Sequence, residues 1–248
     1  MKFYVLESGS KGNCTVVKGK STVLVIDCGG TKKYIKEKFS LIGLDYQKAD
    51  ALLITHEHTD HIKQLKMFSD VDIFSPCKLG EYEVNIVTPY QQFEIGEFSI
   101  MPLALSHDVA HVVGYIITDG QETLVSVTDT GYVSHLNEQH IANADYYIFE
   151  SNYDTGMLMS SDRPVQLKVR IISDSGHLGN EDSARVLTRV TGEKTREIVL
   201  AHLSQECNRE EIALATLKRV FEENRKDYSG YKIAAARQFE MYEGGHND

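Results

Sequence analysis

The segment "LLITHEHTDHIKQL", residues 52–65, constrains this chain more than any other stretch. An apolar run leads directly into four side chains that can bind metals, namely His56, His58, Asp60 and His61. Neutral imidazoles with a carboxylate suit zinc, and also manganese or iron. Because the apolar run predicts a buried strand, these groups are expected in a loop at a strand end, where rigid scaffolds usually carry their sites.

A solvated loop with incidental histidines is the alternative interpretation of this cluster. Three histidines and an aspartate within six positions make it far less convincing here than for a lone HxH pair. Alternating loop positions point in different directions. We therefore expect His56 and His58 to serve one ion, and Asp60 and His61 to serve a neighbouring one.

Further ligands are expected from distant parts of the chain. Two divalent ions about 3.5–4 Å apart need an anionic bridge, and Asp129 in "VTDTG" is the best candidate. His107 and His202 also stand where apolar runs end, although either could have a structural role and His202 could instead move protons. The predicted set is His56, His58 and His107 on one ion, Asp60, His61 and His202 on the other, and Asp129 shared.

The net charge limits the partners that the chain is expected to bind. The sequence has 26 basic and 36 acidic residues, for a net charge of -10, and no strong basic block. Because proteins that grip long nucleic acids normally present Lys and Arg to many phosphates, this balance argues weakly against such partners. No apolar run approaches the roughly 18 residues of a membrane helix. The scattered cysteines and the lack of a signal-peptide pattern predict a cytoplasmic protein.

The order of the predicted elements indicates an α/β fold. We expect strands and hairpins at residues 2–8, 14–29, 51–55, 92–107, 113–131, 146–151, 197–204, 231–236 and 239–243, with a helix at 32–43. The clearest helix is expected at 208–226, where Asn208 can cap the start and Glu211 can complete a capping box. Strands interleaved with helices predict an αββα sandwich of two mixed sheets flanked by helices, as a single domain over residues 1–248.

Several motifs resemble the metallo-β-lactamase fold family along almost the whole chain. "THEHTDH" looks like the family signature. Segments that resemble the YycJ/WalJ branch are "SGSKGNC" (8–14), "IDCG" (26–29), "SHD" (106–108), "DTG" (129–131), "ESNYD" (150–154), "GHLGNEDSA" (176–184) and "HLSQECN" (202–208). That branch is related to ribonuclease Z and includes proteins described as DNA exonucleases. It also resembles phage anti-Pycsar phosphodiesterases, which destroy cyclic pyrimidine mononucleotides.

The resemblance implies a metal-dependent hydrolase with two divalent ions, zinc first and manganese as the alternative. It also implies a homodimer in which a loop of one subunit closes the site of the other, and residues 152–164, which expose Met157, Leu158 and Met159, are the candidate loop. Ordinary packing of these apolar side chains onto the body of the protein is an equally favoured alternative. Two features depart from ribonuclease Z. The region "IAAARQFEMYE" has no histidine ligand near the last strand, and no basic Gly-rich arm for tRNA is present.

The leading functional hypothesis is a phosphodiesterase that hydrolyses cyclic mononucleotides such as cCMP and cUMP to linear monophosphates, in phage evasion of Pycsar immunity. A DNA exonuclease of the YycJ/WalJ type is the alternative, and a metal-stabilised binding protein without turnover is a third class. Asp60 is expected to hold a metal and orient the attacking water. His177, which precedes an expected helix start, is the candidate general acid. Ser10 and Asn13 are expected to brace the metal loop. His111 could be an alternative ligand or a substrate contact, but a structural role is favoured for it.

Overall fold

Two seven-stranded sheets form the centre of the computed structural model, which describes residues 1–246. The first sheet has the order β14 (Tyr242–Gly245), β1 (Lys2–Glu7), β2 (Cys14–Lys18), β3 (Val23–Ile26), β4 (Ala51–Leu53), β5 (Ile73–Ser75) and β6 (Asn85–Ile86). The second has the order β13 (Lys232–Ala235), β12 (Glu197–Ala201), β11 (Tyr146–Glu150), β10 (Thr123–Val127), β9 (Val113–Thr118), β8 (Phe98–Ala104) and β7 (Phe93–Ile95).

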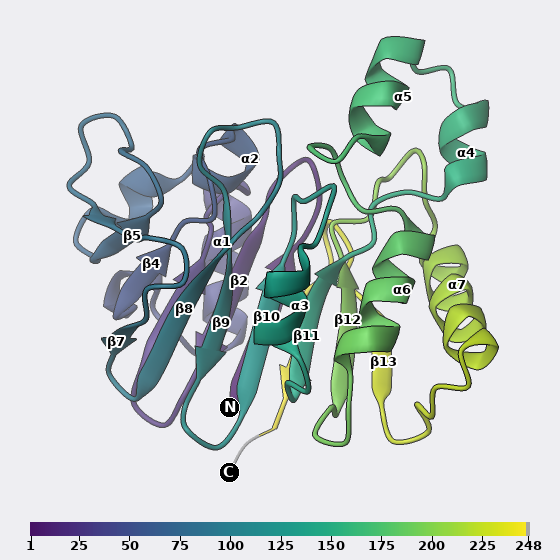
Figure 1. Ribbon diagram of the computed structural model, residues 1–248. Coiled ribbons are helices and arrows are strands. Elements are labelled where there is room, and N and C mark those ends of the chain that lie inside the picture. Colours follow the sequence, from purple (N-terminus) through teal and green to yellow (C-terminus); the bar gives the residue numbers. More distant parts are fainter. Residues whose placement is uncertain (247–248) are drawn as a thin grey trace.

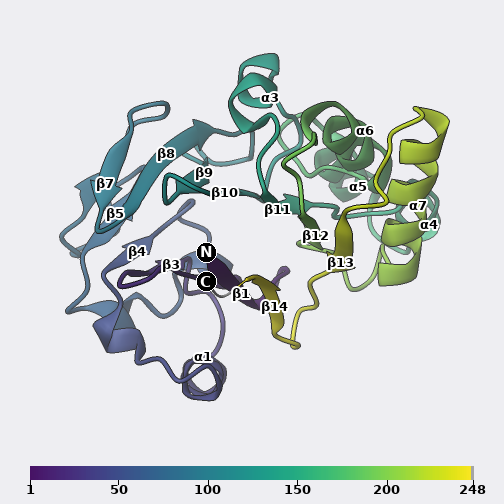
Figure 2. The same ribbon diagram turned by 90° about the horizontal axis from the view of Figure 1, so that it is seen from below.

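Helices cover the outer faces of the two sheets (Figures 1 and 2). The described helices are α1 (Lys32–Leu41), α2 (Thr59–Ile62), α3 (His135–Ile141), α4 (Thr155–Ser160), α5 (Val165–Ile172), α6 (Asn180–Val190) and α7 (Glu210–Glu223), with short 3-10 turns at Tyr46–Lys48 and Leu65–Phe68. In Figure 1, α4 and α5 project beyond the end of the sheets. In Figure 2, α1 lies outside the first sheet, while α3, α6 and α7 lie outside the second. The αββα sandwich of two mixed sheets expected from the sequence is confirmed.

The strand directions bring several loops to one edge of the sandwich. Strands β3 to β6 are parallel in the first sheet, and β10 to β13 are parallel in the second. The remaining neighbours are antiparallel, including the predicted β9–β10 hairpin that turns at Asp119 and Gly120. Since parallel strands end at the same edge of a sheet, the loops after β4, β10 and β12 are placed to share a site.

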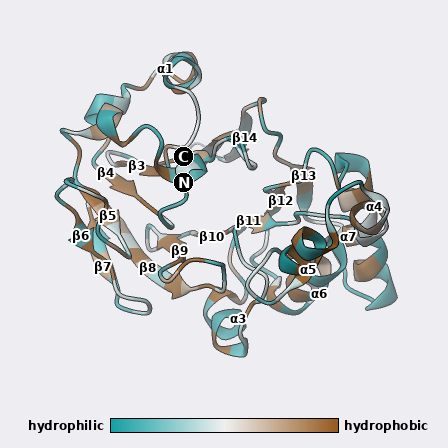
Figure 3. Cartoon of the chain, turned by 90° about the horizontal axis from the view of Figure 1, so that it is seen from above, coloured by the Kyte–Doolittle hydropathy of each residue, from teal (hydrophilic) through white to brown (hydrophobic). Residues whose placement is uncertain are grey.

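Apolar side chains fill three layers and hold these loops on a rigid frame. Phe3, Leu53 and Tyr115 lie in the layer between the sheets. Ile35 and Phe39 of α1 pack on the outer face of the first sheet, and α6 and α7 cover the outer face of the second. Figure 3 shows the hydrophobic colour mainly along the strands and the inward faces of helices. Among residues 1–246, no helix is long and apolar enough to cross a membrane.

Two local predictions are wrong. Helix α7 begins at Glu210 with Arg209 as its N-cap, and the Asn208 amide instead donates to the backbone oxygens of Ser151 and Asn152. The segment 152–164 is not an open loop, because it contains helix α4. Leu158 of that helix is buried against Tyr153 and Ile171, which agrees with the alternative of ordinary packing onto the body of the protein.

Candidate metal centre

The HxHxDH segment lies in the loop and short helix that follow strand β4, as predicted. His56 and His58 lie between β4 and α2, while Asp60 and His61 belong to α2. His56 and His61 are fully buried, whereas His58 and Asp60 are partly exposed. Burying two imidazoles is unfavourable unless their nitrogens find partners, so the local geometry requires a polar or cationic neighbour.

This loop is fixed by the segments that precede it in the chain. The backbone amide of Asn13 donates to the carbonyl oxygen of Asp60 (2.9 Å), and the side-chain nitrogen of Asn13 lies 3.0 Å from Nε2 of His61. A Cβ atom at Gly29 would lie 1.4 Å from that same carbonyl oxygen, so only glycine permits the close approach. The contacts of Asn13 agree with the predicted bracing role. Ser10 is exposed and lines a neighbouring pocket instead.

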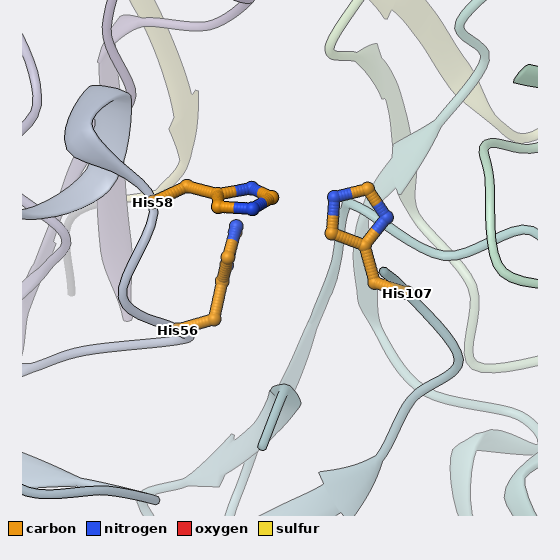
Figure 4. A group of neighbouring side chains, drawn as sticks. All are labelled: His56, His58 and His107. Carbon is orange, nitrogen blue, oxygen red and sulfur yellow. The ribbon is translucent and has the colours of Figure 1, made fainter. Parts of the chain in front are cut away.

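A histidine group is formed by His56, His58 and His107, whose ligand nitrogens lie within 4.8 Å of one another. Figure 4 shows the three rings converging, two from the loop after β4 and His107 from the loop after β8. Burial lowers the pKa of all three imidazoles, and neighbouring histidines lower that of His56 further. Neutral imidazoles leave nitrogen lone pairs available to a cation.

A second set of donors consists of Asp60, His61 and His202, again with ligand atoms within 4.8 Å. Burial would raise the pKa of Asp60, but its hydrogen bond to His61 and the charge of that imidazole lower it to about 2. Burial would likewise lower the pKa of His61, but the carboxylates of Asp27 and Asp129 raise it well above its usual value. A metal ion that binds His61 would therefore have to displace a proton from its ring.

Asp129 lies between the two sets. Its Oδ2 is 3.3 Å from Nε2 of His61, and its Oδ1 is 3.4 Å from Nδ1 of His202 and 3.9 Å from Nε2 of His107. It also belongs to a carboxylate group, defined as Asp129, Glu150, His177 and His202, whose donor atoms all lie within 4.8 Å of one another. This central position is the one that a shared anionic ligand would need.

Four of the histidines predicted to bind metal share one orientation, with Nδ1 held by a neighbouring oxygen. The contacts are His56 with Oγ1 of Thr55 (3.0 Å), His61 with Oδ2 of Asp27 (2.8 Å), His107 with the carbonyl oxygen of Gly176 (3.0 Å) and His202 with Oε1 of Glu150 (2.9 Å). Such contacts orient metal-binding imidazoles and leave Nε2 for the ion. Within residues 1–246, Nε2 of His56, Nε2 of His202 and Oδ2 of Asp129 are buried without a hydrogen-bond partner.

Backbone conformation singles out the same strand ends. Asp27, Asp129 and His202 have φ angles of 59°, 58° and 56°. Asp27 and His202 directly follow β3 and β12, and Asp129 is the second residue after β10. Left-handed conformations of non-glycine residues are uncommon and cost of the order of 1–3 kcal/mol each. Three of them beside one polar cluster indicate that the surrounding fold holds these side chains in place.

Comparison with known proteins assigns the chain to a family. A family model described as "Beta-lactamase superfamily domain" matches residues 22–203. Exodeoxyribonuclease YycJ of Bacillus anthracis is 33% identical over 237 residues, which cover 90% of this chain and 90% of that protein. Exodeoxyribonuclease WalJ of Streptococcus pneumoniae serotype 2 is 34% identical over 232 residues, which cover 87% of this chain and 86% of that protein. This chain belongs to the beta-lactamase superfamily.

The three-dimensional comparison agrees at the level of the fold. The metallo-beta-lactamase fold protein YhfI from Bacillus subtilis superposes with a TM-score of 0.73 at 20% identity, covering 98% of this chain and 99% of that chain. Membership makes the protein a metal-dependent hydrolase of this superfamily. The buried nitrogen and oxygen atoms described above fit divalent ions, because they converge without hydrogen-bond partners among the described residues and are of the types that bind zinc.

The arrangement also contains residues that sequence analysis did not select. The Glu150 carboxylate is fully buried, with Oε1 2.8 Å from Nδ1 of His177 and 2.9 Å from Nδ1 of His202. Asp108 lies 3.2 Å from Nε2 of His107 and forms an ion pair with Arg170 of α5. Glu150 ends strand β11 and Asp27 follows β3, so a carboxylate at the end of a buried strand was the available signal.

The remaining predicted residue lies outside these sets. His111 is exposed and belongs to none of the donor groups found among residues 1–246. This placement gives no support to the alternative role of His111 as a metal ligand, and its structural role stays a prediction. His177, the candidate general acid, lies in the carboxylate group, between α5 and the start of α6.

Proposed function

We propose that this superfamily hydrolase is a metal-dependent exodeoxyribonuclease, which cleaves phosphodiester bonds at DNA ends. One observation carries the proposal: the relatives that match the chain almost from end to end are named exodeoxyribonucleases. The site chemistry supports it. Metal-dependent phosphodiester hydrolysis needs ligands that hold the metal ions, an acceptor for the proton of the attacking water and a proton donor for the leaving oxygen. The histidine group, Asp60 and the carboxylate group can supply these functions.

Two divalent ions, zinc first and manganese as the alternative, would be held as the sequence predicts. His56, His58 and His107 would hold one, Asp60, His61 and His202 the other, and Asp129 both. When bound, such ions lower the pKa of water and neutralise the phosphoryl oxygens of the substrate. Asp60 stays ionised at neutral pH, since its pKa lies at about 2, and its carboxylate can orient the attacking water.

His177 is proposed as the proton donor to the leaving oxygen. Burial would lower its pKa, but the Glu150 carboxylate, which contacts Nδ1 at 2.8 Å, raises it above the usual value. A protonated imidazole at neutral pH is the form that a general acid requires. The side chain is 20% exposed, so a substrate can reach the ring.

Hydrolysis of cyclic mononucleotides such as cCMP and cUMP is the second candidate function. The specific observation in its favour is the net charge of -10, which disfavours a long polyanion more than a small nucleotide. The same metal ligands and His177 would serve both reactions. A role in phage evasion of Pycsar signalling in the host cytoplasm follows only from this second candidate.

A homodimer remains part of the proposal. Helix α5 and the end of α4 present exposed apolar side chains, namely Met159, Val165, Val169 and Ile172. A cluster of exposed apolar residues on neighbouring helices favours contact with another protein surface. The exposed Met159, rather than the buried Leu158, would supply the apolar contact expected from the 152–164 segment.

Product analysis separates these functions. The zinc- or manganese-loaded protein is incubated with single-stranded DNA, duplex DNA and a panel of cyclic mononucleotides, next to a His56→Ala/His58→Ala control. Release of mononucleotides from DNA, with cyclic nucleotides intact, is the expected result. Linear monophosphates from cyclic nucleotides, with DNA intact, would instead establish the second candidate.

A further inference from the structure

A pocket of about 620 Å³ opens directly beside the metal loop. Its walls come from the β1–β2 loop, the start of α1, helix α2 and the β13–β14 turn, and they include Lys11, Tyr34, Asp60, Lys63 and Phe239. Asp60 belongs to this wall and to the donor set with His61 and His202. A pocket of this size is in the range that holds small organic ligands. A group bound there would adjoin the proposed reaction centre.

Phe239 presents an aromatic surface to this pocket. The side chain is 56% exposed, and its ring packs edge-to-face on Tyr34 with centroids 6.5 Å apart. The preceding Gln238 anchors the turn, because its Nε2 donates to the Gly12 carbonyl oxygen (2.9 Å) and its Oε1 accepts from the Lys11 amide (3.0 Å). Because this ring is largely exposed, it contributes little to the stability of the hydrophobic core. It is well placed to stack on a planar ligand.

Two lysines bring positive charge to the wall of this pocket, which also contains the carboxyl groups of Glu7 and Asp60. The ammonium group of Lys11 lies 5.6 Å from the centre of the Phe239 ring, and Lys63 directly follows α2. Neither ammonium group forms an ion pair with a carboxylate within residues 1–246, so both can meet a phosphate. An aromatic ring interleaved with lysines is the usual chemistry of a surface that binds single-stranded nucleic acid.

We propose that the pocket lined by Lys11, Lys63 and Phe239, called the base pocket below, receives a nucleobase from the DNA strand being cleaved. The base would stack on Phe239, and the adjoining phosphates would lie near Lys11 and Lys63. The inference rests on the proposed exonuclease function and names its substrate more narrowly. A base can enter a pocket only after leaving the duplex stack. The substrate class is therefore a single-stranded or frayed DNA end, and the local lysines offset the acidic charge of the chain as a whole.

Binding tests this pocket independently of turnover. The metal-loaded protein is titrated with single-stranded oligonucleotides that carry 2-aminopurine at either end and phosphorothioate linkages that resist cleavage. The chain contains no Trp, so intrinsic fluorescence interferes little. We expect binding to quench the 2-aminopurine of at least one oligonucleotide. Phe239→Leu should weaken that binding by about tenfold or more, whereas Phe239→Tyr should retain it.

A matched control is Tyr82→Leu, which removes another exposed aromatic ring (37% exposed) at a different pocket. This variant should quench like the unmodified protein. Absence of quenching by the unmodified protein, or equal binding by Phe239→Leu, would overturn the base pocket. For charge, Lys11→Ala and Lys63→Ala should each reduce the salt dependence of binding, by about 0.7 in log–log slope. The exposed Lys66 lies outside the pocket lining, and Lys66→Ala should leave the slope unchanged.

Kinetics separate a failure of the pocket from a failure of the proposed function. The unmodified enzyme should cleave single strands with a normal terminal base at a KM at least about tenfold below that for strands with an abasic end. Phe239→Leu should lose this preference and keep its activity on abasic ends. Cleavage without any base preference would overturn the pocket and leave the exonuclease intact. No cleavage of any DNA would overturn the exonuclease, while the binding titration would still decide the pocket.

Discussion

The histidine group and the carboxylate group line the same centre but differ in chemistry. The first contains His56, His58 and His107, with no carboxylate among them. The second combines two carboxylates, Asp129 and Glu150, with two imidazoles, of which one is His177. The two groups differ in their charges. The three imidazoles of the first group are favoured in the neutral form, which can bind a cation. In the second group, the Glu150 carboxylate favours the protonated form of His177, which can donate a proton.

Burial opposes the charged form of the imidazoles in both groups, but the final direction of the pKa shift differs. Burial and the surrounding histidines lower the pKa of His56, which keeps this ring neutral and able to bind a metal. In the carboxylate group burial also opposes charge, but Glu150 raises the pKa of His177. For His177 the carboxylate partner therefore outweighs burial, whereas no such partner among the described residues opposes burial at His56.

The largest effect should follow from emptying the histidine group. His56→Ala combined with His58→Ala removes two of its three imidazoles, so bound metal should fall and phosphodiester hydrolysis should drop by more than about 100-fold. Metal content by elemental analysis and activity on DNA provide the two measurements. A variant with full metal content and full activity would show that this group is not a metal site.

A smaller effect is expected in the carboxylate group. His177→Ala should slow turnover by about 10²–10⁴-fold, because the leaving oxygen loses its proton donor, while the metal content stays unchanged. His111→Ala is the control, since it removes an exposed histidine outside both groups. Loss of metal from His177→Ala would assign His177 as a ligand and would remove the distinction between the groups.

The charge of Glu150 should set the pH range of activity. Because this carboxylate raises the pKa of His177, Glu150→Gln should lower that pKa. A general acid works only while protonated, so the decline of kcat at high pH should begin at a lower pH in the variant. The measurement is kcat against pH, with the metal content checked for both proteins. If kcat declined at the same high pH in both proteins, Glu150 would not control the pKa of the general acid.

The smallest effect concerns a buried carboxyl group without a histidine partner. Burial raises the pKa of Glu7 to about 7, with only partial compensation from Lys63, and its Oε1 has no hydrogen-bond partner within residues 1–246. A raised carboxyl pKa destabilises the fold as pH rises from the unfolded value through the folded value. Glu7→Gln should therefore raise the melting temperature by about 2–4 °C at pH 8 and less at pH 5.

The exposed Glu83 gives the matched control for that experiment. Glu83→Gln should leave the melting temperature nearly unchanged at both pH values. If Glu7→Gln had the same effect at pH 5 and pH 8, ionisation of Glu7 would not be the cause.

The sequence allowed the histidine group to be predicted more easily than the carboxylate group for a physical reason. His56 and His58 are two positions apart and follow an apolar run, so local pattern alone brought them together. Glu150 and His202 are 52 residues apart, and their contact depends on the pairing of β11 with β12. Asp129 was found only because it also follows a strand.

The fold was predictable because its strands and main helices have clear hydrophobic patterns, whereas details fixed by tertiary contacts were not. Asn208 fits a capping box, but the backbone of Ser151 and Asn152 accepts its amide hydrogens instead. Leu158 lies in a polar segment, yet α4 buries it against Tyr153 and Ile171. In both places a long-range contact outweighed a local preference that short-range sequence patterns could express.

Anomalous scattering at the zinc edge, from crystals of the zinc-loaded protein, tests the central claim most directly. We predict two peaks per chain, one among His56, His58 and His107 and the other among Asp60, His61 and His202, with Asp129 contacting both. Peaks elsewhere in the protein, or no peak above background, would contradict the account.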